Sequence, residues 1–340
     1  MSTAIQSLVQ VDAEACNRVA ELIASKPIPP DQEDSRLPGF PRSAIGNFYL
    51  ALVAICHQTS PRGCAPLEGM VGGIRRRGWD YLFARLEEAA RAEPTLLEPE
   101  RWVSLSVKEL RAVFRDAELG ERLSNPELRS ELLRDLGRGM TAHGWRWADD
   151  IYRLSGGRIG TGELNLLQLL AEFRAYNDPV RKKSLFYLAL MRNAGLWQYV
   201  DEEQLGTPVD YHEVRGHLRL GTVRIVDEAL RQTILSFRSV SAVEDIAIRQ
   251  AVYDAIMLIS ERSGVRNPSQ LHYLFWNVFR SICTRDSPQC FRLSPTCSLP
   301  ARYMHLTELT GGRRCPFSEV CASAGEASPI CEHVYETDYY

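Results

Sequence analysis

Nine cysteines occur in the 340-residue chain, and six of them fall in its C-terminal part: Cys283, Cys290, Cys297, Cys315, Cys321 and Cys331. Residues 1–11 lack a basic start followed by an apolar run, so we expect no secretory signal and a cytoplasmic protein. Thiols stay reduced in that compartment. Cysteines gathered this densely therefore predict a metal site rather than disulfides.

The spacing of these cysteines favours an iron–sulfur cluster. Cys283-x6-Cys290 is followed at the same spacing by Cys297, and later by Cys315-x5-Cys321. Thiolates on short irregular segments can hold a 4Fe-4S cluster. Zinc is the alternative, although its four-cysteine sites usually use knuckles with two to four residues between the cysteines. Cys297 could replace Cys283 as a ligand, and Cys331 is a weaker spare.

Two adjacent lysines could supply a nucleophilic amine. Asp178 as N-cap and Pro179 at the first position predict a helix start, which places Lys182 and Lys183 in the first turns. The helix dipole disfavours cations there. A lysine over an apolar face and beside another lysine should have a lowered pKa, as Schiff-base chemistry needs. Solvated surface charges are the alternative interpretation.

An aspartate follows at a second predicted helix start. Asp210 and Glu213, after Pro208, have the spacing of a capping box, which would explain the pair without any catalysis. Arg215 and Arg219 then fall on one face of the same predicted helix.

Together these segments resemble the helix-hairpin-helix (endonuclease III-like) DNA glycosylases. That family ends in C-x6-C-x2-C-x5-C, which this chain matches with the middle spacer expanded, and it carries a V-D-x-H stretch. Glu213 stands where the family has an apolar residue, and the L-P-G hairpin is absent. Matching positions in the aspartate stretch are Val209, Asp210, His212, Arg215, Arg219 and Gly221.

The lysine segment is similar to the D-P-x-x-K-[ST] helix of archaeal 8-oxoguanine DNA glycosylases. The resemblance implies that Lys183, or Lys182 in its place, is the nucleophile, and that Asp210 stabilises the sugar cation. It further implies that Tyr187 stacks on an extruded base and that Gln58 reads its edge, which an amide can do. Alternatively, Gln58 is a glutamine at a helix end whose side chain lies in water.

A compact basic loop precedes Trp79. Arg75, Arg76 and Arg77 follow two glycines there, and such a loop suits phosphate contacts. We expect Arg215 and Arg219 to support the same DNA backbone, and Trp79 to lie near the base pocket. Ordinary surface arginines are the alternative.

Helical periodicity runs through nearly the whole chain, clearest in 79–88, 241–262 and 271–282. No alternating strand pairs joined by Asn-Gly or Asp-Gly turns are evident, and loops are expected at 26–41, 60–78, 155–162 and 284–314. We predict an all-α fold in which two helical subdomains flank a cleft. The expected divisions are an N-terminal helix and linker (1–42), a glycosylase-like domain (43–282) and a cysteine-rich iron–sulfur loop and tail (283–340).

Composition is that of a globular protein, with 45% hydrophobic and 24% charged residues. The net charge of −3 requires any DNA-binding face to be local. No membrane span is expected. The hypothesis is a monomeric DNA glycosylase that flips a damaged or modified base out of double-stranded DNA, with or without AP-lyase activity. Alternatives are a phage-defence glycosylase for hypermodified cytosine, a 7-deazaguanine nucleotide N-glycosylase, and a non-catalytic iron–sulfur DNA-binding module.

Overall fold

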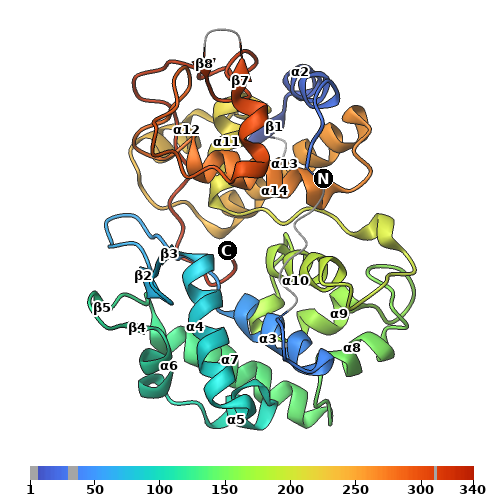
Figure 1. Cartoon of the computed structure of the whole chain (residues 1–340). Helices are drawn as coiled ribbons and strands as arrows, with labels where there is room; N and C mark the ends of the chain where they lie inside the picture. The colour runs from blue at the N-terminus through green and yellow to red at the C-terminus, as the bar shows by residue number, and fades with distance from the viewer. Residues whose placement is uncertain (1–6, 30–36, 310–311) are drawn as a thin grey trace. The chain divides into compact units, whose positions relative to one another are not determined.

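The computed structural model describes residues 7–29, 37–309 and 312–340. This part of the chain is mostly helical, with only short two-stranded ladders (Figure 1), so the all-α prediction is confirmed. Two compact units are present. Unit 1 combines the described part of 1–32 with 205–336, and unit 2 the described part of 33–204 with 337–340. Within the described ranges, no helix is long and apolar enough to cross a membrane.

Unit 1 joins the N-terminal segment to the C-terminal half of the chain. Strand β1 (Val9–Val11) pairs antiparallel with β6 (Val223–Ile225), which explains why the division differs from the expected boundaries at 42 and 282. The other elements are α2 (Ala13–Ala24), α11 (Tyr211–Leu220), α12 (Glu228–Leu235), α13 (Ala242–Ser263), α14 (Pro268–Ser281), the short 3-10 helix η4 (Ala301–Thr307), and strands β7 (Glu308–Leu309) and β8 (Gly312–Arg313).

The two predicted helices of this unit are confirmed. Ser241 caps α13 through a capping box with Glu244, and Gly264 ends the helix at a φ of +72°. Helix α14 covers the predicted 271–282 almost completely, and Cys283 follows two residues after its end. Apolar side chains of α2, α11, α13 and α14 form one core.

Unit 2 is built around α3 (Arg42–Ala54), which is buried from Ala44 to its end. Its further helices are α4 (Trp79–Ala92), α5 (Pro99–Ser104), α6 (Val107–Val113), α7 (Pro126–Ala142), α8 (Ala148–Leu154), α9 (Leu166–Ala171) and α10 (Lys182–Asn193), with 3-10 turns η1 (Pro94–Leu97), η2 (Arg174–Tyr176) and η3 (Glu202–Gln204). Strands β2 (Glu68–Val71) and β3 (Ile74–Arg77) form a hairpin, as do β4 (Arg115–Asp116) and β5 (Gly120–Glu121).

Two local predictions are wrong. Helix α10 begins at Lys182 and not near Pro179, because Arg181 adopts a left-handed φ of +61°. The Asp178 carboxylate accepts the backbone N–H of Lys182 (2.9 Å) and so caps the helix from a preceding turn. Residues 68–77, expected within a loop, form the β2–β3 hairpin. The predicted loop at 155–162 is confirmed, and those at 26–41 and 284–314 lie partly outside the described residues.

Candidate metal centre and catalytic groups

Asp210 opens α11 as its N-cap. Its Oδ1 accepts the backbone N–H of His212 (2.7 Å), and its Oδ2 accepts the indole N–H of Trp276 (3.1 Å). The Glu213 carboxylate returns a bond to the backbone N–H of Asp210 (2.8 Å), so the predicted capping box is confirmed. Asp210 is 8% exposed, so its carboxylate is held in place but is not fully enclosed.

Glu213 makes a buried pair that the sequence analysis did not anticipate. Its second oxygen contacts Nδ1 of His272 on α14, and both side chains are buried. Because a carboxylate in an apolar core needs a polar partner, His272 explains how a glutamate is accommodated at position 213. His272 and Trp276 lie four residues apart on α14 and so share one helix face. That spacing in the sequence could have indicated that both side chains contact the start of α11.

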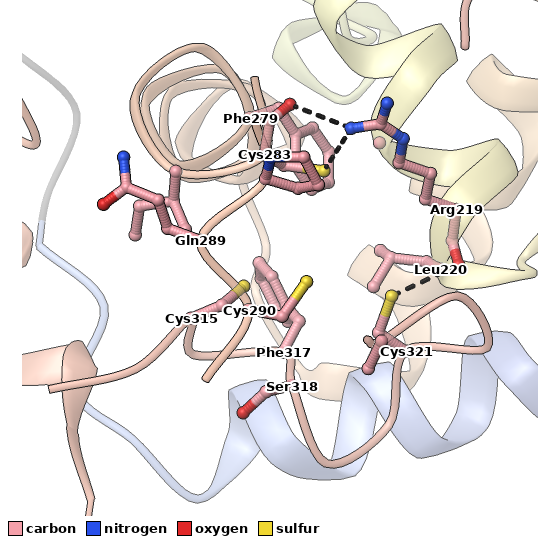
Figure 2. Close-up of a pocket in the computed structure, with 14 residues that line it drawn as sticks. Arg219, Leu220, Phe279, Cys283, Gln289, Cys290, Cys315, Phe317, Ser318 and Cys321 are labelled. Carbon is pink, nitrogen blue, oxygen red and sulfur yellow. Dashed lines mark hydrogen bonds between the residues drawn. The ribbon is translucent and has the colours of Figure 1, made fainter. Parts of the chain in front are cut away.

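The opposite end of α11 borders a hollow lined by four cysteines (Figure 2). The hollow holds about 340 Å³ of space free of atoms, part of it open to solvent. We call this space, between Cys283, Cys290, Cys315 and Cys321, the cysteine hollow. Its remaining wall is largely apolar and includes Gly216, Leu220, Phe279, Ile282 and Phe317.

Backbone contacts hold the four cysteines around this hollow. Cys290 and Cys315 are joined by a bond from the Cys315 N–H to the Cys290 carbonyl (3.1 Å). The Cys321 thiol donates to the carbonyl of Arg219 (3.2 Å), and the next residues donate N–H groups to the last carbonyls of α11. Gly221 is the C-cap of α11, with a φ of +81°, and the segment after Cys321 supplies N–H donors to the last carbonyls of the helix, which have no partner within it.

Gly216 lets α11 and α14 approach closely beside the hollow. A Cβ at this position would lie 2.1 Å from the ring of Phe279. Any larger residue would therefore push α14 away, together with Cys283 that follows it. The glycine is explained by this approach, and not by an unusual φ.

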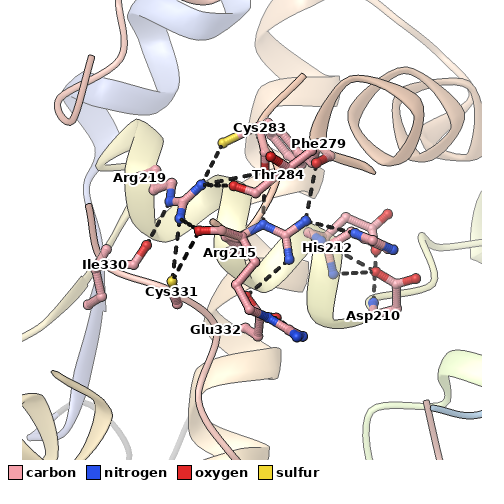
Figure 3. Close-up of polar contacts among 12 residues, drawn as sticks. Asp210, His212, Arg215, Arg219, Phe279, Cys283, Thr284, Ile330, Cys331 and Glu332 are labelled. Atoms are coloured by element: carbon pink, nitrogen blue, oxygen red, sulfur yellow. Dashed lines mark hydrogen bonds and ion pairs between the residues drawn. The ribbon is translucent and has the colours of Figure 1, made fainter. Parts of the chain in front are cut away.

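Arg219 connects two thiols with the backbone around them (Figure 3). Its guanidinium donates to Sγ of Cys283 and to Sγ of Cys331, each at 3.4 Å. It also donates to the carbonyls of Thr284 (2.8 Å) and Ile330 (2.7 Å). With 2% exposure, Arg219 holds the tail and the cysteine loop on α11 and is not placed to contact DNA.

Arg215 is enclosed in the same way, one turn earlier. It forms a buried ion pair with Glu332 (3.0 Å) and donates to the carbonyls of Cys283 (2.8 Å) and Phe279 (3.1 Å), as Figure 3 shows. Its exposure is also 2%. The expectation that Arg215 and Arg219 support the DNA backbone therefore does not fit their geometry, because neither guanidinium reaches the surface.

Burial makes two of the thiols poor acids in the ligand-free chain. It raises the pKa of Cys321 to about 11 and that of Cys315 still further, and the neighbouring Cys283 and Cys290 side chains add to both shifts. A metal bound here would have to displace those protons, because only thiolates are strong ligands.

The remaining C-terminal cysteines do not line the hollow. The thiol of Cys297 lies 3.8 Å from the carbonyl of Ser281, and the thiol of Cys331 contacts Arg219. Of the five cysteines predicted as ligands, only Cys297 is thus placed elsewhere. Among the residues that the structure describes, no three His, Cys, Asp or Glu side chains meet closely enough for a single metal ion.

Lys183 and Lys182 are both buried in unit 2 and are not the solvated surface charges of the alternative interpretation. Nζ of Lys183 donates to the carbonyl of Ala54 and lies 3.5 Å from Nδ1 of His57. Burial is the main cause that lowers the pKa of Lys183 to about 7. Nζ of Lys182 lies 3.4 Å from Sγ of Cys56 and 5.0 Å from the centre of the Phe186 ring.

The expected base-pocket residues are only partly gathered. Trp79 packs edge-on against Phe186 at 4.9 Å and so lies near Lys182. Gln58 follows the end of α3 with a φ of +41°, beside His57. Tyr187 is fully buried against Trp197 and Tyr176, so its ring has no exposed face on which a base could stack.

The three arginines of the basic segment lie on strand β3. Arg75 and Arg77 are exposed, Arg76 is half-buried, and Arg75 pairs with Glu68 across the hairpin (2.8 Å). These side chains, unlike Arg215 and Arg219, are placed where a phosphate could reach them.

No known protein-family model matches the chain, and no curated protein is significantly similar to it. Lys183 belongs to unit 2, whereas Asp210 and the cysteine hollow belong to unit 1. The functional interpretation therefore depends on the geometry within each unit.

Proposed function

We propose that this protein is an iron–sulfur DNA glycosylase that releases a damaged or modified base from duplex DNA. One observation carries the proposal: the ten-residue helix α11 begins at Asp210 and ends at the cysteine hollow. At a rise of about 1.5 Å per residue, roughly 15 Å separates its two ends. A cofactor in the hollow would thus fix the helix that presents the carboxylate.

The hollow suits a 4Fe-4S cluster. Cys283, Cys290, Cys315 and Cys321 would be its ligands, and the cluster would fasten the C-terminal loop to α11 and α14. Each thiolate of such a cluster binds its own iron, so four sulfurs distributed around a space fit it. Zinc, the alternative, would require all four sulfurs at about 2.3 Å from one point. The apolar wall would limit access of water to the cluster.

The carboxylate of Asp210 suits stabilisation of positive charge. When a glycosidic bond breaks, the base leaves with the bonding electrons and positive charge develops on the sugar. A carboxylate oriented by Trp276 and by backbone N–H groups can face that charge without reorganising. A helix cap needs only a hydrogen-bond acceptor, whereas stabilisation of the sugar cation needs the negative charge of Asp210.

Lys183 supplies the second part of the proposed chemistry. Its lowered pKa leaves much of the amine neutral near pH 7, as an attack on C1′ of the sugar requires. The new C–N bond would form as the C1′–base bond breaks, and the released base would take up a proton. Because Lys183 is fully buried, a nucleotide reaches the amine only if the side chains around it move.

That burial also favours a second candidate, a monofunctional enzyme. In this case water attacks C1′, Asp210 stabilises the sugar cation, and Lys183 does not form a covalent bond. The product would be an intact abasic site. The two candidates differ in a single observable, the covalent adduct between protein and DNA.

Borohydride trapping on duplexes that carry modified bases tests the proposal. The chain has only four lysines, Lys26, Lys108, Lys182 and Lys183, so mass spectrometry can assign an adduct without ambiguity. We expect an adduct at Lys183 that is absent from Lys183→Met and retained in the exposed control Lys108→Met. Base release that survives Lys183→Met and is lost in Asp210→Asn would indicate the monofunctional enzyme. No release from any modified duplex would overturn the proposal.

A further inference from the structure

Basic side chains gather at the C-terminal end of α3, in the interior of unit 2. Nζ of Lys183 donates to the carbonyl of Ala54, the last residue of the helix. The guanidinium of Arg129 donates to the carbonyl of Ile55 and, at 2.6 Å, to that of His57. The last carbonyls of a helix have no partner within it and favour cations, which explains why buried basic groups are accommodated here.

Cys56 brings a thiol into the same group. Its Sγ accepts a hydrogen bond from Nζ of Lys182, the first residue of α10, at 3.4 Å. Lys182 is 7% exposed, whereas Cys56 is only half-buried, so a small molecule reaches the sulfur more readily than the amine. Cys56 also acts on the two fully buried cations, because it counteracts the lowering of the pKa that burial causes at Lys183 and Arg129.

The surroundings of Cys56 are those of a reactive thiol. Cys16 provides the contrast, because it lies in the core of unit 1, where burial is the main cause that raises its pKa to about 12. Thiols that react readily are partly exposed and lie beside cations, which favour the nucleophilic thiolate form. Cys56 meets the first condition by its exposure and the second through Lys182.

We propose that Cys56 and Lys182 form a peroxide-sensitive pair, in which oxidation joins the two side chains through a sulfur–nitrogen bond. The oxidant is a hydroperoxide, of which hydrogen peroxide is the simplest. In the first step the thiolate sulfur attacks one oxygen, and the S–O bond forms as the O–O bond breaks. The leaving hydroxide takes a proton from the Lys182 ammonium, so the products are a sulfenic acid, water and a neutral amine.

The second step joins the two residues. The amine of Lys182 attacks the sulfenic sulfur, and the S–N bond forms as the S–O bond breaks. The hydroxyl group leaves with a proton of the amine as a second water, so one peroxide suffices for both steps. Sulfenic acids condense with nitrogen in this way to give sulfenamides. The separation of 3.4 Å between sulfur and nitrogen lies within the roughly 3–3.5 Å of a near-attack arrangement.

This bond would alter the surroundings of Lys183, the next residue of α10. It removes the charges of Cys56 and Lys182 together and ties the segment after α3 to the start of α10. The side-chain movement that gives access to the buried Lys183 amine would then be restricted. The pair goes beyond the proposed function and stands whether or not the protein releases bases, because its chemistry needs only a peroxide, the thiol and the amine.

Peptide mass spectrometry after exposure of the protein to limiting hydrogen peroxide tests the pair. We expect a cross-linked peptide that joins Cys56 to Lys182 and that a thiol reductant separates. Lys182→Arg keeps a cation beside the sulfur but has no primary amine, so dimedone should trap Cys56 as a sulfenic acid without a cross-link. Lys182→Met should slow oxidation of Cys56 about tenfold, to the rate of the exposed Cys64, because the cation is lost. Lys108→Met, at an exposed position, is the matched control.

Two outcomes would overturn the pair. Oxidation of wild-type Cys56 no faster than that of Cys64 would show that its surroundings do not activate the thiol. A sulfenic acid that persists in the wild type without a bond to Lys182 would show that the amine does not capture it. Base release enters neither measurement, so failure of the glycosylase proposal leaves both results intact. Circular dichroism spectra before oxidation would establish that the variants are folded, and the wild-type comparisons decide even where Lys182→Met is not.

Discussion

The amine of Lys183 and Nδ1 of His57 lie 3.5 Å apart in the interior of unit 2. Both groups lose affinity for protons there. Burial, with Arg129 nearby, lowers the pKa of His57 well below 6.5, and burial lowers that of Lys183 to about 7. At neutral pH the imidazole is therefore neutral and the amine is close to its titration midpoint. Among the other neighbours of Lys183, Cys56 and Asp338 raise its pKa, whereas Lys182 and Arg129 lower it further.

We predict that covalent trapping at Lys183 depends on pH with a midpoint near 7. Only the neutral amine attacks, and the neutral fraction rises about tenfold between pH 6 and pH 8 for such a group. The trapping rate should rise accordingly and level off above pH 8. His57→Leu should lower the midpoint, because it removes an acceptor that stabilises the ammonium form. A midpoint near 10 would show that Lys183 is not buried in the reacting state.

The lowered pKa of Lys183 should also make the free energy of unfolding depend on pH. Between pH 7 and 10.5 the unfolded chain binds a proton that native Lys183 does not, so wild-type stability should rise with pH across this window. Lys183→Met should stabilise the protein at pH 7 by on the order of 4 kcal/mol, since the pKa is lowered from 10.5 to about 7 and each pKa unit corresponds to about 1.4 kcal/mol. The gain should vanish near pH 10.5. Urea titrations at pH 7 and pH 10.5, with Lys108→Met as control, are the measurement. Equal stability of Lys183→Met and wild type at pH 7 would contradict the lowered pKa.

The cysteine hollow predicts which thiols bind metal. Serine at position 283, 290, 315 or 321 should remove most of the iron, the acid-labile sulfide and the broad visible absorbance. Cys297→Ser should retain all three, because its thiol lies away from the hollow. Iron and sulfide analysis of anaerobically purified protein is the measurement. Zinc without sulfide in the wild-type protein would contradict the cluster assignment, and iron loss in Cys297→Ser would contradict the ligand set.

Periodicity and caps sufficed to predict α4, α13 and α14, but the 17-residue helix α7 was not predicted. The Ser241 capping box and Gly264 bound α13 in the sequence as in the structure, and the Asp210–Glu213 box does the same at the start of α11. The hairpin at residues 68–77 was missed, although Gly72-Gly73 between apolar residues is a recognised turn signal. Each of its strands has only four residues, too few for an alternating pattern to stand out.

The sequence indicated which residue types form the candidate site, but not which of their side chains are buried. Four of the five predicted cysteine ligands line one hollow. The close spacing within each pair, Cys283 with Cys290 and Cys315 with Cys321, is visible in the sequence, but the contact between the pairs across residues 291–314 is not. Arg215 and Arg219 were expected at a DNA surface, since an arginine pair on a helix gives no sign of burial. Their enclosure depends on Glu332 and on carbonyls more than 60 residues away along the chain, which no local pattern reveals.

Two substitutions should separate the capping role of Asp210 from the role of its charge. Asp210→Asn keeps an acceptor for the N–H groups of α11 but loses the acceptor for the indole N–H of Trp276, and should cost about 1 kcal/mol. Asp210→Ala loses both acceptors and should cost about 2 kcal/mol. Both should abolish base release, because neither retains the negative charge. Ser241→Ala, which removes a cap elsewhere in unit 1, should lose similar stability with full activity. Base release by Asp210→Asn would show that Asp210 only caps α11 and that its charge has no part in catalysis.

The buried arginines should affect stability and leave DNA contacts unchanged. Arg215→Met removes one of the two arginines that pair with the buried Glu332 carboxylate, and Arg285 remains as its partner, so the cost should fall below the roughly 3–5 kcal/mol of a fully broken buried pair. Glu332→Gln should cost more, because it leaves buried Arg215 without a counter-charge and the amide NH2 group would face one of the two arginines. The salt dependence of DNA binding by folded Arg215→Met should equal that of wild type, in contrast to Arg75→Gln with Arg77→Gln. A weaker salt dependence in Arg215→Met would place that guanidinium on DNA and contradict its enclosure.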